Sequence, residues 1–300
     1  MRCLYKLFNC VKYFFYSWVG SLFPKFLTQY RFKKKFGRKI NWTNPRDLNE
    51  KIQWLKFYSD TSDWTRLADK YRVREYIEEK GFGDNLVQLY GKWDKAEDID
   101  WNSLPDKFVM KVNNGSGDVL ICKDKRILNI KDTTLLFNKL LKKKFGCSTA
   151  EPHYWNIKPC IIAEELLDIT KQPIVTSSLI DYKIWCFNGS PECIWTCYNR
   201  NKKTVEVATY DLKWEYHPEW SNFTHHYIQA KTLLPKPKSL DMMLEMASKL
   251  SVGFPQVRID LYEVDGKPYF GEMTFTSNYG MMEFYTQEYL YYLGSKVHLY

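Results

Sequence analysis

Two runs near the carboxyl end of the chain, residues 257–261 and 269–274, constrain its fold more than any other feature. They flank Asp265 and Gly266, a dipeptide typical of β-hairpin turns. Apolar and polar side chains alternate over residues 257–261 and again over residues 272–275, as expected for strands with one buried face. The polar set contains two acids, an arginine and a threonine: Arg258, Asp260, Glu272 and Thr274. On one shared face, these side chains would suit Mg²⁺ and phosphate.

The length of the hairpin loop decides whether the two acids share that face. A two-residue turn at Asp265 and Gly266 would put Asp260 and Glu272 on opposite faces. A three-residue loop, with Gly266 in the left-handed region, restores a shared face. Arg258 would then lie opposite Glu272, with Asp260 one pair away. We predict the three-residue loop and a metal site; the alternative is a surface hairpin whose solvated face is charged.

The basic charge of the chain is concentrated at its start. Ten of the 44 Lys and Arg residues and none of the 35 Asp and Glu residues lie in residues 1–39, which leaves 34 basic and 35 acidic residues beyond them. The formal net charge of +9 therefore belongs to an N-terminal arm on a nearly neutral body. A nucleic-acid-binding body would carry the basic residues on its fold, so we expect no nucleic-acid partner.

The same arm is rich in aromatic residues. Its longest uncharged run, residues 13–24, is too short to span a bilayer, which needs about 20 residues. Aromatics such as Phe14 and Trp18, followed by Lys33–Lys35, suit a segment that lies in the membrane interface and is attracted to anionic lipid. We expect residues 1–40 to form this arm, and the protein to be cytoplasmic and peripheral at the inner face of the plasma membrane. The alternative is an ordinary helix whose aromatics pack on the body.

The cysteines and histidines show no metal spacing. The eight cysteines include no C-x-x-C pair, and the five histidines include no H-E-x-x-H pattern. We therefore expect reduced structural thiols and no zinc enzyme.

Strand patterns interleaved with helix patterns indicate an α+β fold rather than a doubly wound parallel sheet. The predicted helices include residues 64–80, with Asp63 as N-cap, and residues 132–145, which end at Gly146. Strands are predicted at both ends of residues 108–124 and over residues 161–167, 182–187, 193–198 and 205–210.

Lys111 lies on a predicted strand just before a turn that contains Gly115, Ser116 and Gly117. Glycines let backbone N–H groups approach phosphate oxygens, and the lysine adds a point charge. The pattern is neither a P-loop nor a dinucleotide motif, so a plain hairpin turn remains the alternative.

A second strand pattern, residues 181–187, places Lys183 on the same face as Asp181, and Arg200 follows its predicted partner strand. These cations suit a triphosphate or an anionic substrate. An exposed ladder with cross-strand pairs is the alternative.

Taken in order, these features resemble the TupA-like ATP-grasp family, which is associated with bacterial surface-polysaccharide and teichuronopeptide synthesis. The resemblance covers most of residues 40–280. Six stretches carry it: NPRDLNEKIQWLKFY (44–58), DKYRVREYI (69–77), FVMKVNNGSGDVLICKDK (108–125), KPCIIAEELL (158–167), DYKIWCFNG (181–189) and GFPQVRIDLYEVDGKPYFGEMTFT (253–276).

The resemblance implies an ATP-grasp fold, in which two α+β subdomains clamp a nucleotide. It leads us to expect an N-terminal helical region over residues 41–105. A small subdomain with the phosphate loop would cover residues 106–167, and a large subdomain with the metal hairpin would cover residues 168–300.

The resemblance also implies roles for single residues. At the phosphates of ATP we expect Lys111 and the turn formed by Gly115, Ser116 and Gly117. At the adenine we expect the hinge formed by Glu164, Glu165 and Leu167, and at the ribose we expect Asp168. Those expected at the reacting groups are Lys183, Arg200 and Arg258, and the expected Mg²⁺ ligands are Asp260, Glu272 and Thr274.

The chain departs from the family pattern at three places. Family members usually have Cys-Asn-His-Gly-Ser-Gly where residues 112–117 read Val-Asn-Asn-Gly-Ser-Gly. They also tend to have a Pro-Gly-Gly-type loop at residues 276–280. Thr274 stands where the wider superfamily commonly has asparagine, so Asn278 or water is expected to complete the metal shell.

The resemblance implies an ATP- and Mg²⁺-dependent carboxylate–amine ligase of bacterial surface-polysaccharide synthesis, which works through an acyl phosphate. The expected partners are a carboxylate-bearing glycan or its lipid-linked precursor, with a uronic acid as the carboxylate, and an amino acid or other amine. One alternative is a glycosyltransferase of capsule or lipopolysaccharide synthesis. Another is an inactive, membrane-tethered nucleotide-binding scaffold.

Overall fold

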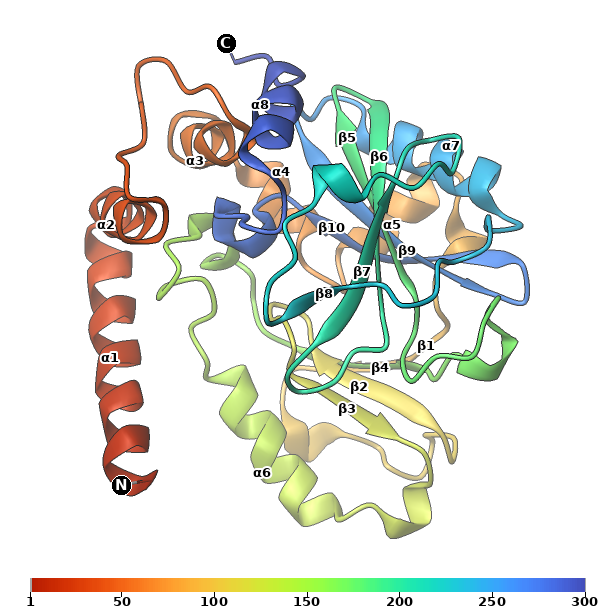
Figure 1. The fold of residues 1–300 in the computed structure, drawn as a ribbon. Helices are drawn as coiled ribbons and strands as arrows, with labels where there is room; N and C mark the ends of the chain where they lie inside the picture. Colours follow the sequence, from red (N-terminus) through yellow and green to blue (C-terminus); the bar gives the residue numbers. More distant parts are fainter. Residues whose placement is uncertain (1, 300) are drawn as a thin grey trace. The chain divides into compact units, whose positions relative to one another are not determined.

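The chain forms two compact units, each built from segments far apart in the sequence (Figure 1). The computed structural model describes residues 2–299, and the side chains of residues 12–299. Unit 1 consists of Met1–Lys39, Asp60–Val73 and Val87–Leu166. Unit 2 consists of Ile40–Ser59, Arg74–Leu86 and Leu167–Tyr300. The basic side chains predicted at Arg2 and Lys6 lie outside the described side chains.

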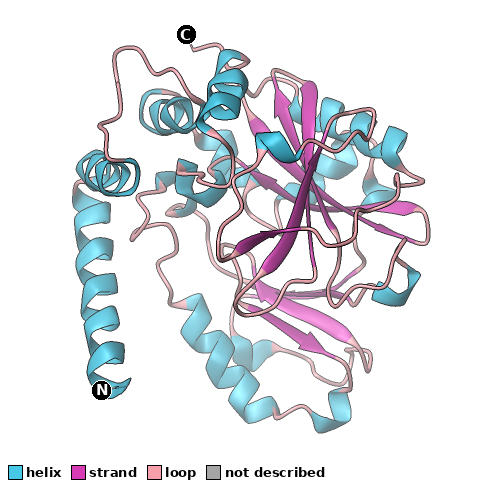
Figure 2. Ribbon diagram, in the orientation of Figure 1, coloured by secondary structure: helices cyan, strands magenta, loops and turns pink. Residues whose placement is uncertain are grey.

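Unit 1 contains a four-stranded antiparallel sheet in the order β1-β4-β2-β3. Its strands are β1 (Leu89–Trp93), β2 (Phe108–Val112), β3 (Val119–Cys122) and β4 (Ile161–Glu165). Helix α6 (Ile130–Leu141) packs beside this sheet (Figure 2), and its Phe137 is buried with Met110 and Ile161. Alternate residues of the central strand β2 thus face one apolar core, as the period of two requires.

The other helices of unit 1 are α1 (Arg2–Leu22), α2 (Pro24–Phe36) and α4 (Ser62–Leu67). The junction of α1 and α2 packs on a segment near residue 150, where Val19, Leu27 and Ala150 are buried together. Gly20 allows this close approach, because a Cβ there would lie 1.9 Å from the carbonyl oxygen of Cys147.

Unit 2 contains a six-stranded sheet in the order β10-β9-β5-β6-β7-β8. Neighbouring strands are antiparallel except β7 and β8. The strands are β5 (Asp181–Phe187), β6 (Ser190–Tyr198), β7 (Val205–Tyr210), β8 (Tyr227–Gln229), β9 (Val257–Val264) and β10 (Lys267–Thr274). The helices are α3 (Leu48–Tyr58), α5 (Val73–Glu79), α7 (Leu240–Ser251) and α8 (Gln287–Ser295). The first residue of α5, Val73, belongs to unit 1, and the rest of this helix belongs to unit 2. Helix α7 packs on β5, β6 and β9, and α3 packs on α8 (Figure 1).

The predicted α+β class is confirmed by these two largely antiparallel sheets and their helices. Within the described part of the chain, no helix is both long enough and apolar enough to cross a membrane.

The predicted three-residue hairpin loop is wrong, but the predicted shared face is correct. Val264 pairs with Lys267, so the turn has two residues, Asp265 and Gly266, with φ of +57° and +72°. Two positive φ values are typical of a type I′ turn, which suits the twist of a hairpin. The register then shifts between Phe270 and Glu272, so that Glu272 lies opposite Asp260. The bulge at Gly271 supplies the extra residue that we assigned to the loop.

The helix predicted over residues 64–80 is two helices, α4 and α5. The carboxylate of Asp69 accepts hydrogen bonds from the N–H groups of Tyr71 at 2.8 Å and Arg72 at 3.2 Å. Such a local turn offers the backbone an alternative to helix and interrupts it.

Helix α6 also differs from its prediction at both ends. It begins earlier, because Asn129 rather than Asp132 is the N-cap and accepts a hydrogen bond from the N–H of Asp132 at 3.1 Å. It ends at Leu141, with Lys142 as its C-cap, four residues before the predicted end at Phe145.

Candidate functional site

Two neighbouring strands of unit 2 bring Lys183, Arg258 and Asp260 together inside the protein. Lys183 on β5 lies directly opposite Asp260 on β9, and its Nζ lies 2.5 Å from Asp260 Oδ2. Arg258 donates from Nε to Asp260 Oδ1 at 2.7 Å and from Nη2 to Oδ2 at 2.8 Å. Asp260 is 1% exposed, and the two cations are 7% exposed each. Charge-assisted hydrogen bonds between buried groups hold all three side chains in one geometry.

Arg258 also contacts the end of β10 and the loop that follows it. Its Nη1 donates to Ser277 Oγ at 2.5 Å, and its Nη2 donates to Thr274 Oγ1 at 3.2 Å. Thr274 Oγ1 donates to Glu272 Oε1 at 3.1 Å, and that oxygen lies 3.7 Å from Arg258 Nη2. The planar guanidinium thus connects both strands of the hairpin to the loop. The sequence showed no pattern that identifies Ser277 as a partner.

Asp181 and Arg200 extend this cluster toward solvent. Lys183 Nζ lies 3.4 Å from Asp181 Oδ1, and Arg200 Nη2 lies 3.5 Å from Asp181 Oδ2. The side chain of Arg200 is 46% exposed and that of Glu272 is 36% exposed. We refer to Asp181, Lys183, Arg200, Arg258, Asp260, Glu272 and Thr274 as the charged cluster. Its three cations face three carboxylates.

Burial and mutual attraction shift the pKa values inside the charged cluster. Burial disfavours the charged forms of Lys183 and Arg258, but the neighbouring carboxylates outweigh it and raise the pKa of both cations. Burial raises the pKa of the Asp260 carboxyl above its usual value, although Arg258 and Lys183 favour its ionised form. Both cations therefore stay charged at physiological pH and can attract an anion.

The oxygen atoms of the charged cluster fit a divalent cation. A carboxylate has about four acceptor positions, and hydrogen bonds from Lys183 and Arg258 occupy three of those on Asp260. One position therefore remains on Oδ1. The hydroxyl of Thr274 accepts one hydrogen bond and donates one, so one lone pair remains on it. Mg²⁺ commonly uses one or two carboxylates and keeps several waters, which this donor set, with the more exposed Glu272, allows.

In unit 1, the lysine expected at phosphate forms an ion pair with the glutamate expected at adenine. Lys111 on β2 and Glu164 on β4 lie on adjacent strands, two positions apart in the ladder. Lys111 Nζ lies 2.5 Å from Glu164 Oε2, and the two side chains are 20% and 9% exposed. A phosphate bound to Lys111 would share or replace this contact.

The turn of residues 115–117 connects β2 to β3 and lies beside two further lysines. Lys70 Nζ donates to the carbonyl oxygen of Gly115 at 2.7 Å, and Lys143 Nζ lies 2.6 Å from Asp118 Oδ2. Gly117 has φ of +82°, and a Cβ there would meet no other atom within 4 Å, so the turn is open. Our sequence reasoning missed both lysines, although Lys70 lies in one of the stretches that carry the family resemblance.

Asn113 fixes the start of this turn. Its Oδ1 accepts the N–H of Cys160 at 2.8 Å, and its Nδ2 donates to the carbonyl oxygen of Lys158 at 3.0 Å. Its own N–H donates to the carbonyl oxygen of Cys160 at 3.0 Å. The end of β2 is thereby tied to the segment that leads into β4.

The residues expected at adenosine lie where the chain passes from unit 1 to unit 2. Glu164 and Glu165 end β4 in unit 1, and Leu167 begins the next part of unit 2. Leu167 is buried. Asp168 Oδ1 accepts hydrogen bonds from the N–H and hydroxyl of Thr170 at 2.9 and 2.7 Å.

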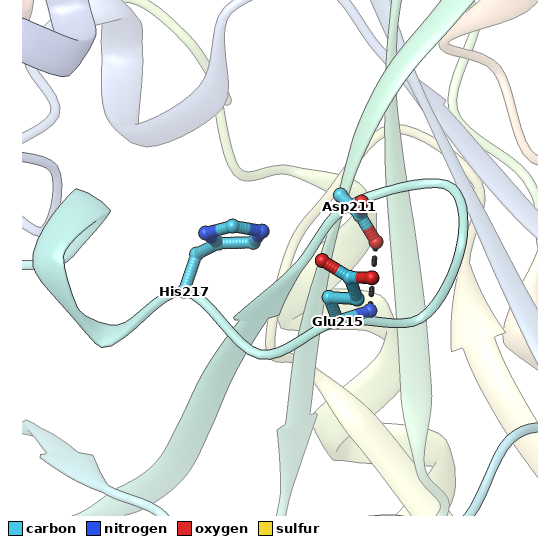
Figure 3. A group of neighbouring side chains, drawn as sticks. All are labelled: Asp211, Glu215 and His217. Atoms are coloured by element: carbon cyan, nitrogen blue, oxygen red, sulfur yellow. Dashed lines mark hydrogen bonds between the residues drawn. The ribbon is translucent and has the colours of Figure 1, made fainter.

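A second group of metal-type ligands, Asp211, Glu215 and His217, follows β7 (Figure 3). One ligand atom of each lies within 4.8 Å of the others. Local contacts account for the arrangement: Asp211 Oδ1 accepts the N–H of Glu215 at 2.7 Å, and His217 Nδ1 lies 2.7 Å from Glu219 Oε1. This is a carboxylate-stabilised turn, and we assign no ligand to it.

Comparison with known proteins gives one family match. A sequence model described as TupA-like ATPgrasp matches residues 50–298. A search of curated proteins finds no significant match.

The solved structures with similar folds include three ligases or synthetases. D-alanine–D-alanine ligase from Bacillus anthracis is 16% identical with a TM-score of 0.43, and the match covers 84% of this chain and 69% of that one. Phosphoribosylamine–glycine ligase from Thermotoga maritima is 13% identical with a TM-score of 0.42, and the match covers 73% and 52%. D-cycloserine synthetase is 12% identical with a TM-score of 0.43, and the match covers 78% and 70%. At these TM-scores the likeness does not bear on function.

Proposed function

The chain belongs to the TupA-like ATP-grasp family, and on this premise we propose that it is an ATP- and Mg²⁺-dependent carboxylate–amine ligase. The family match supports an ATP-dependent ligase activity. The observation in the structure that carries the proposal is the charged cluster, in which the buried cations Lys183 and Arg258 flank Asp260. Fixed cations beside a carboxylate suit a reaction that moves a phosphoryl group between anionic oxygens.

Unit 1 would supply the phosphate contacts, and the segment by which the chain passes into unit 2 would supply those to adenosine. Lys111 and the backbone N–H groups of residues 115–117 would bind phosphate oxygens, with Lys70 and Lys143 adding positive charge nearby. Glu164 to Leu167 would contact adenine, and Asp168 would contact the ribose.

The charged cluster would supply the chemistry. A carboxylate oxygen of the acceptor forms a bond to the γ-phosphorus of ATP, and the bond from that phosphorus to the β–γ bridging oxygen breaks, which releases ADP. The amine then attacks the carbonyl carbon of the acyl phosphate and loses a proton to solvent. Phosphate leaves, and an amide remains. Arg258, Arg200 and Lys183 would stabilise the negative charge that develops at each step.

Asp260 and Glu272, with Thr274, would hold Mg²⁺. The bound ion would neutralise part of the negative charge of the phosphates. The protein would hold these oxygens in place through Arg258, which contacts all three side chains. Asn278 or water would complete the metal shell.

The substrate class follows from the family. We propose a uronic acid of a surface polysaccharide, or of its lipid-linked precursor, as the carboxylate, and an amino acid or related amine as the nucleophile. The family's association with bacterial surface polysaccharides supports this part of the proposal.

The N-terminal arm would place the enzyme at an anionic membrane surface, at the inner face of the plasma membrane. Of its described side chains, six large apolar ones are more than half exposed: Phe14, Phe15, Trp18, Leu22, Phe23 and Phe26. Phe14, Trp18 and Leu22 are four residues apart and share one face of α1. Val19 and Leu27, by contrast, pack inside unit 1. This exposed apolar face with neighbouring lysines favours interfacial binding over packing on the body.

The experiment that tests the ligase is release of ADP and phosphate from Mg²⁺-ATP, with uronic-acid acceptors crossed against a panel of amines. Asp260→Asn and Glu272→Gln should abolish release. Glu215→Gln, which removes a carboxylate of the second acidic group, is the matched control and should retain it. ATP binding without ADP release in any mixture would favour a nucleotide-binding scaffold. Turnover of sugar nucleotides without ATP would replace the ligase with a glycosyltransferase.

A further inference from the structure

The loop after β10 has an uncommon backbone conformation over three consecutive residues. Asn278, Tyr279 and Gly280 follow one another with φ of +47°, +57° and +70°. Residues other than glycine rarely adopt the left-handed region, and for a residue as bulky as tyrosine it is strained. Such strain persists where neighbouring contacts hold the backbone in place. We refer to residues 277–280 as the left-handed loop.

Helix α3 supplies those contacts through two buried amides. Gln53 Nε2 donates to the carbonyl oxygens of Tyr279 and Gly280, both at 2.8 Å. Asn49, one helical turn earlier, accepts the N–H of Met282 at 2.8 Å and donates to its carbonyl oxygen at 2.9 Å. Both amides are essentially without solvent exposure, so four hydrogen bonds connect α3 to the backbone of this loop and of Met282, two residues beyond it.

The packing of α3 on the left-handed loop is as close as the hydrogen bonding. A Cβ at Gly280 would lie 2.5 Å from Gln53 Nε2 and 2.7 Å from Ile52 Cγ2. The start of the helix is itself fixed, because Asp47 caps it by accepting the N–H of Glu50 at 2.9 Å. The stretch of residues 44–58 therefore forms a rigid support for the loop.

The left-handed loop meets the charged cluster at Ser277. The hydroxyl of this residue accepts from Arg258 Nη1 at 2.5 Å, and the rest of the guanidinium contacts Asp260 and Thr274. Ser277 is 2% exposed. The position of Arg258 thus depends on Asp260 from one side and on the left-handed loop from the other.

We propose that Asn49 and Gln53 are positioning residues for the phosphoryl transfer described above, on which this inference rests. They act on the backbone of the left-handed loop, the loop fixes Ser277, and Ser277 fixes Arg258. A cation held in place before the reaction stabilises developing charge without reorganisation. Because a misplacement of about 1 Å can lower a rate about 100-fold, the support of Arg258 is expected to matter for turnover more than for ATP binding.

The test compares full-length variants of one helix. Gln53→Met and Asn49→Leu remove the contacts to the loop segment. Lys51→Met is the matched control, because Lys51 Nζ donates from the same helix to the carbonyl oxygen of Val297 at 2.7 Å, away from the left-handed loop. For each variant we would measure kcat for ADP release, KM for ATP, Tm, and amide hydrogen exchange over residues 277–282.

We expect Gln53→Met and Asn49→Leu to lower kcat by about 10- to 100-fold, with KM for ATP nearly unchanged and faster exchange in residues 277–282. Lys51→Met should lower Tm without changing kcat. Ser277→Ala should lower kcat like Gln53→Met. The double variant of Gln53→Met with Ser277→Ala should have a kcat no lower than that of the more impaired single variant, because both changes act through Arg258.

Three outcomes would overturn the inference alone. The first is faster exchange in Gln53→Met with normal kcat, and the second is independent and fully additive effects of Gln53→Met and Ser277→Ala. A loss of kcat in Lys51→Met equal to that in Gln53→Met would reduce the role of α3 to general stability, and would also overturn it. A wild-type protein that releases no ADP with any substrate pair would overturn the proposed function, and this inference with it.

Discussion

Asp260 lies directly opposite Glu272, and one extra residue on β10, Gly271, makes this pairing possible. A two-residue type I′ turn alone would place the two carboxylates on opposite faces of the sheet. The bulge at Gly271 shifts the register by one residue and brings them to the same face as Arg258. The shared face of the two proposed metal ligands therefore depends on a bulge in the strand rather than on the loop.

Gly271→Ala should destabilise the protein by about 1–3 kcal/mol, because an added Cβ would lie 2.9 Å from the backbone oxygen of Asp260, which cannot move aside freely. Gly83→Ala is the control, since a Cβ there meets only the flexible Glu78 Cγ at 3.4 Å. Its effect should stay within about 0.5 kcal/mol. Urea unfolding measures both, and equal effects would contradict the importance of the close approach at the bulge.

Asp260→Asn should lower the free energy of unfolding by about 3–5 kcal/mol, because it leaves the buried cations Lys183 and Arg258 without their shared carboxylate. Lys171→Met breaks a pair with Asp265 whose side chains are 55% and 78% exposed, and should cost at most about 1 kcal/mol. Denaturant unfolding of both variants without nucleotide or metal separates this effect from any role in binding. A cost for Asp260→Asn no larger than that for Lys171→Met would show that the buried pair contributes little.

The alternating pattern of the hairpin was enough to predict the shared face of the four polar side chains. It was not enough to predict how the face is formed, because a three-residue loop and a two-residue turn with a bulge have the same parity. Because the turn has two residues and the bulge follows it, Arg258 lies opposite Thr274 rather than opposite Glu272 as predicted. Residues 64–80 kept a helical pattern although the carboxylate of Asp69 interrupts the helix.

Contacts between distant segments could not be predicted. Gln53 and Asn49 lie more than 220 residues from the loop segment that they hold, and such pairing leaves no periodic pattern in the sequence. Ser277 is a short polar residue in a loop, and nothing in its neighbourhood in the sequence indicates a buried arginine partner.

Lys111→Met should weaken ATP binding about 10- to 100-fold, the worth of one charge-assisted hydrogen bond to phosphate. Lys158→Met is the control, because Lys158 lies in the same unit with its side chain 76% exposed and paired to Asp94. Calorimetric titration with ATP measures both affinities. Equal affinities for wild type and Lys111→Met would remove Lys111 from the phosphate site.

Glu164→Gln should have opposite effects on two ligands. It releases Lys111 from the ion pair at 2.5 Å, so binding of inorganic tripolyphosphate should strengthen. Binding of ATP should weaken if Glu164 contacts adenine, as we propose. Parallel titrations with the two ligands measure this, and a stronger affinity for both would mean that Glu164 only balances the lysine.

The buried thiols should make the protein less stable at alkaline pH. Burial raises the pKa of Cys193 to about 12, whereas a thiol in the unfolded chain has a pKa of about 8.5. A raised folded-state pKa means that this stabilising term is fully present below about pH 8.5 and is lost progressively as pH rises toward 12. At pH 10 the unfolded state gains about 2 kcal/mol from ionising this one thiol.

Cys193→Ala removes that gain. The fall in unfolding free energy between pH 7.5 and pH 10 should therefore be about 2 kcal/mol smaller in the variant than in wild type. Urea unfolding at the two pH values measures the difference, and identical pH dependence would show that the thiol ionises readily in the folded state.

The exposed face of α1 should determine membrane affinity. Phe14 and Trp18 are 66% and 60% exposed, and burying such a side chain in the membrane interface is worth about 1.5–3 kcal/mol. Phe14→Ser with Trp18→Ser should therefore weaken co-sedimentation with anionic vesicles by at least about 100-fold. Tyr291→Ser in α8 removes an aromatic that is 44% exposed outside the arm and should have no effect.

Charge should contribute separately from the aromatic face. Replacing Lys33, Lys34 and Lys35 by glutamine should cost about 1 kcal/mol for each lysine on anionic vesicles and nothing on zwitterionic ones. Added salt should weaken binding of wild type more than binding of this variant, because fewer of the variant's contacts are screened. If the Phe14 and Trp18 variants co-sediment like wild type, the arm does not bind through α1. If the lysine variant keeps the salt dependence of wild type, the attraction to lipid lies elsewhere on the chain.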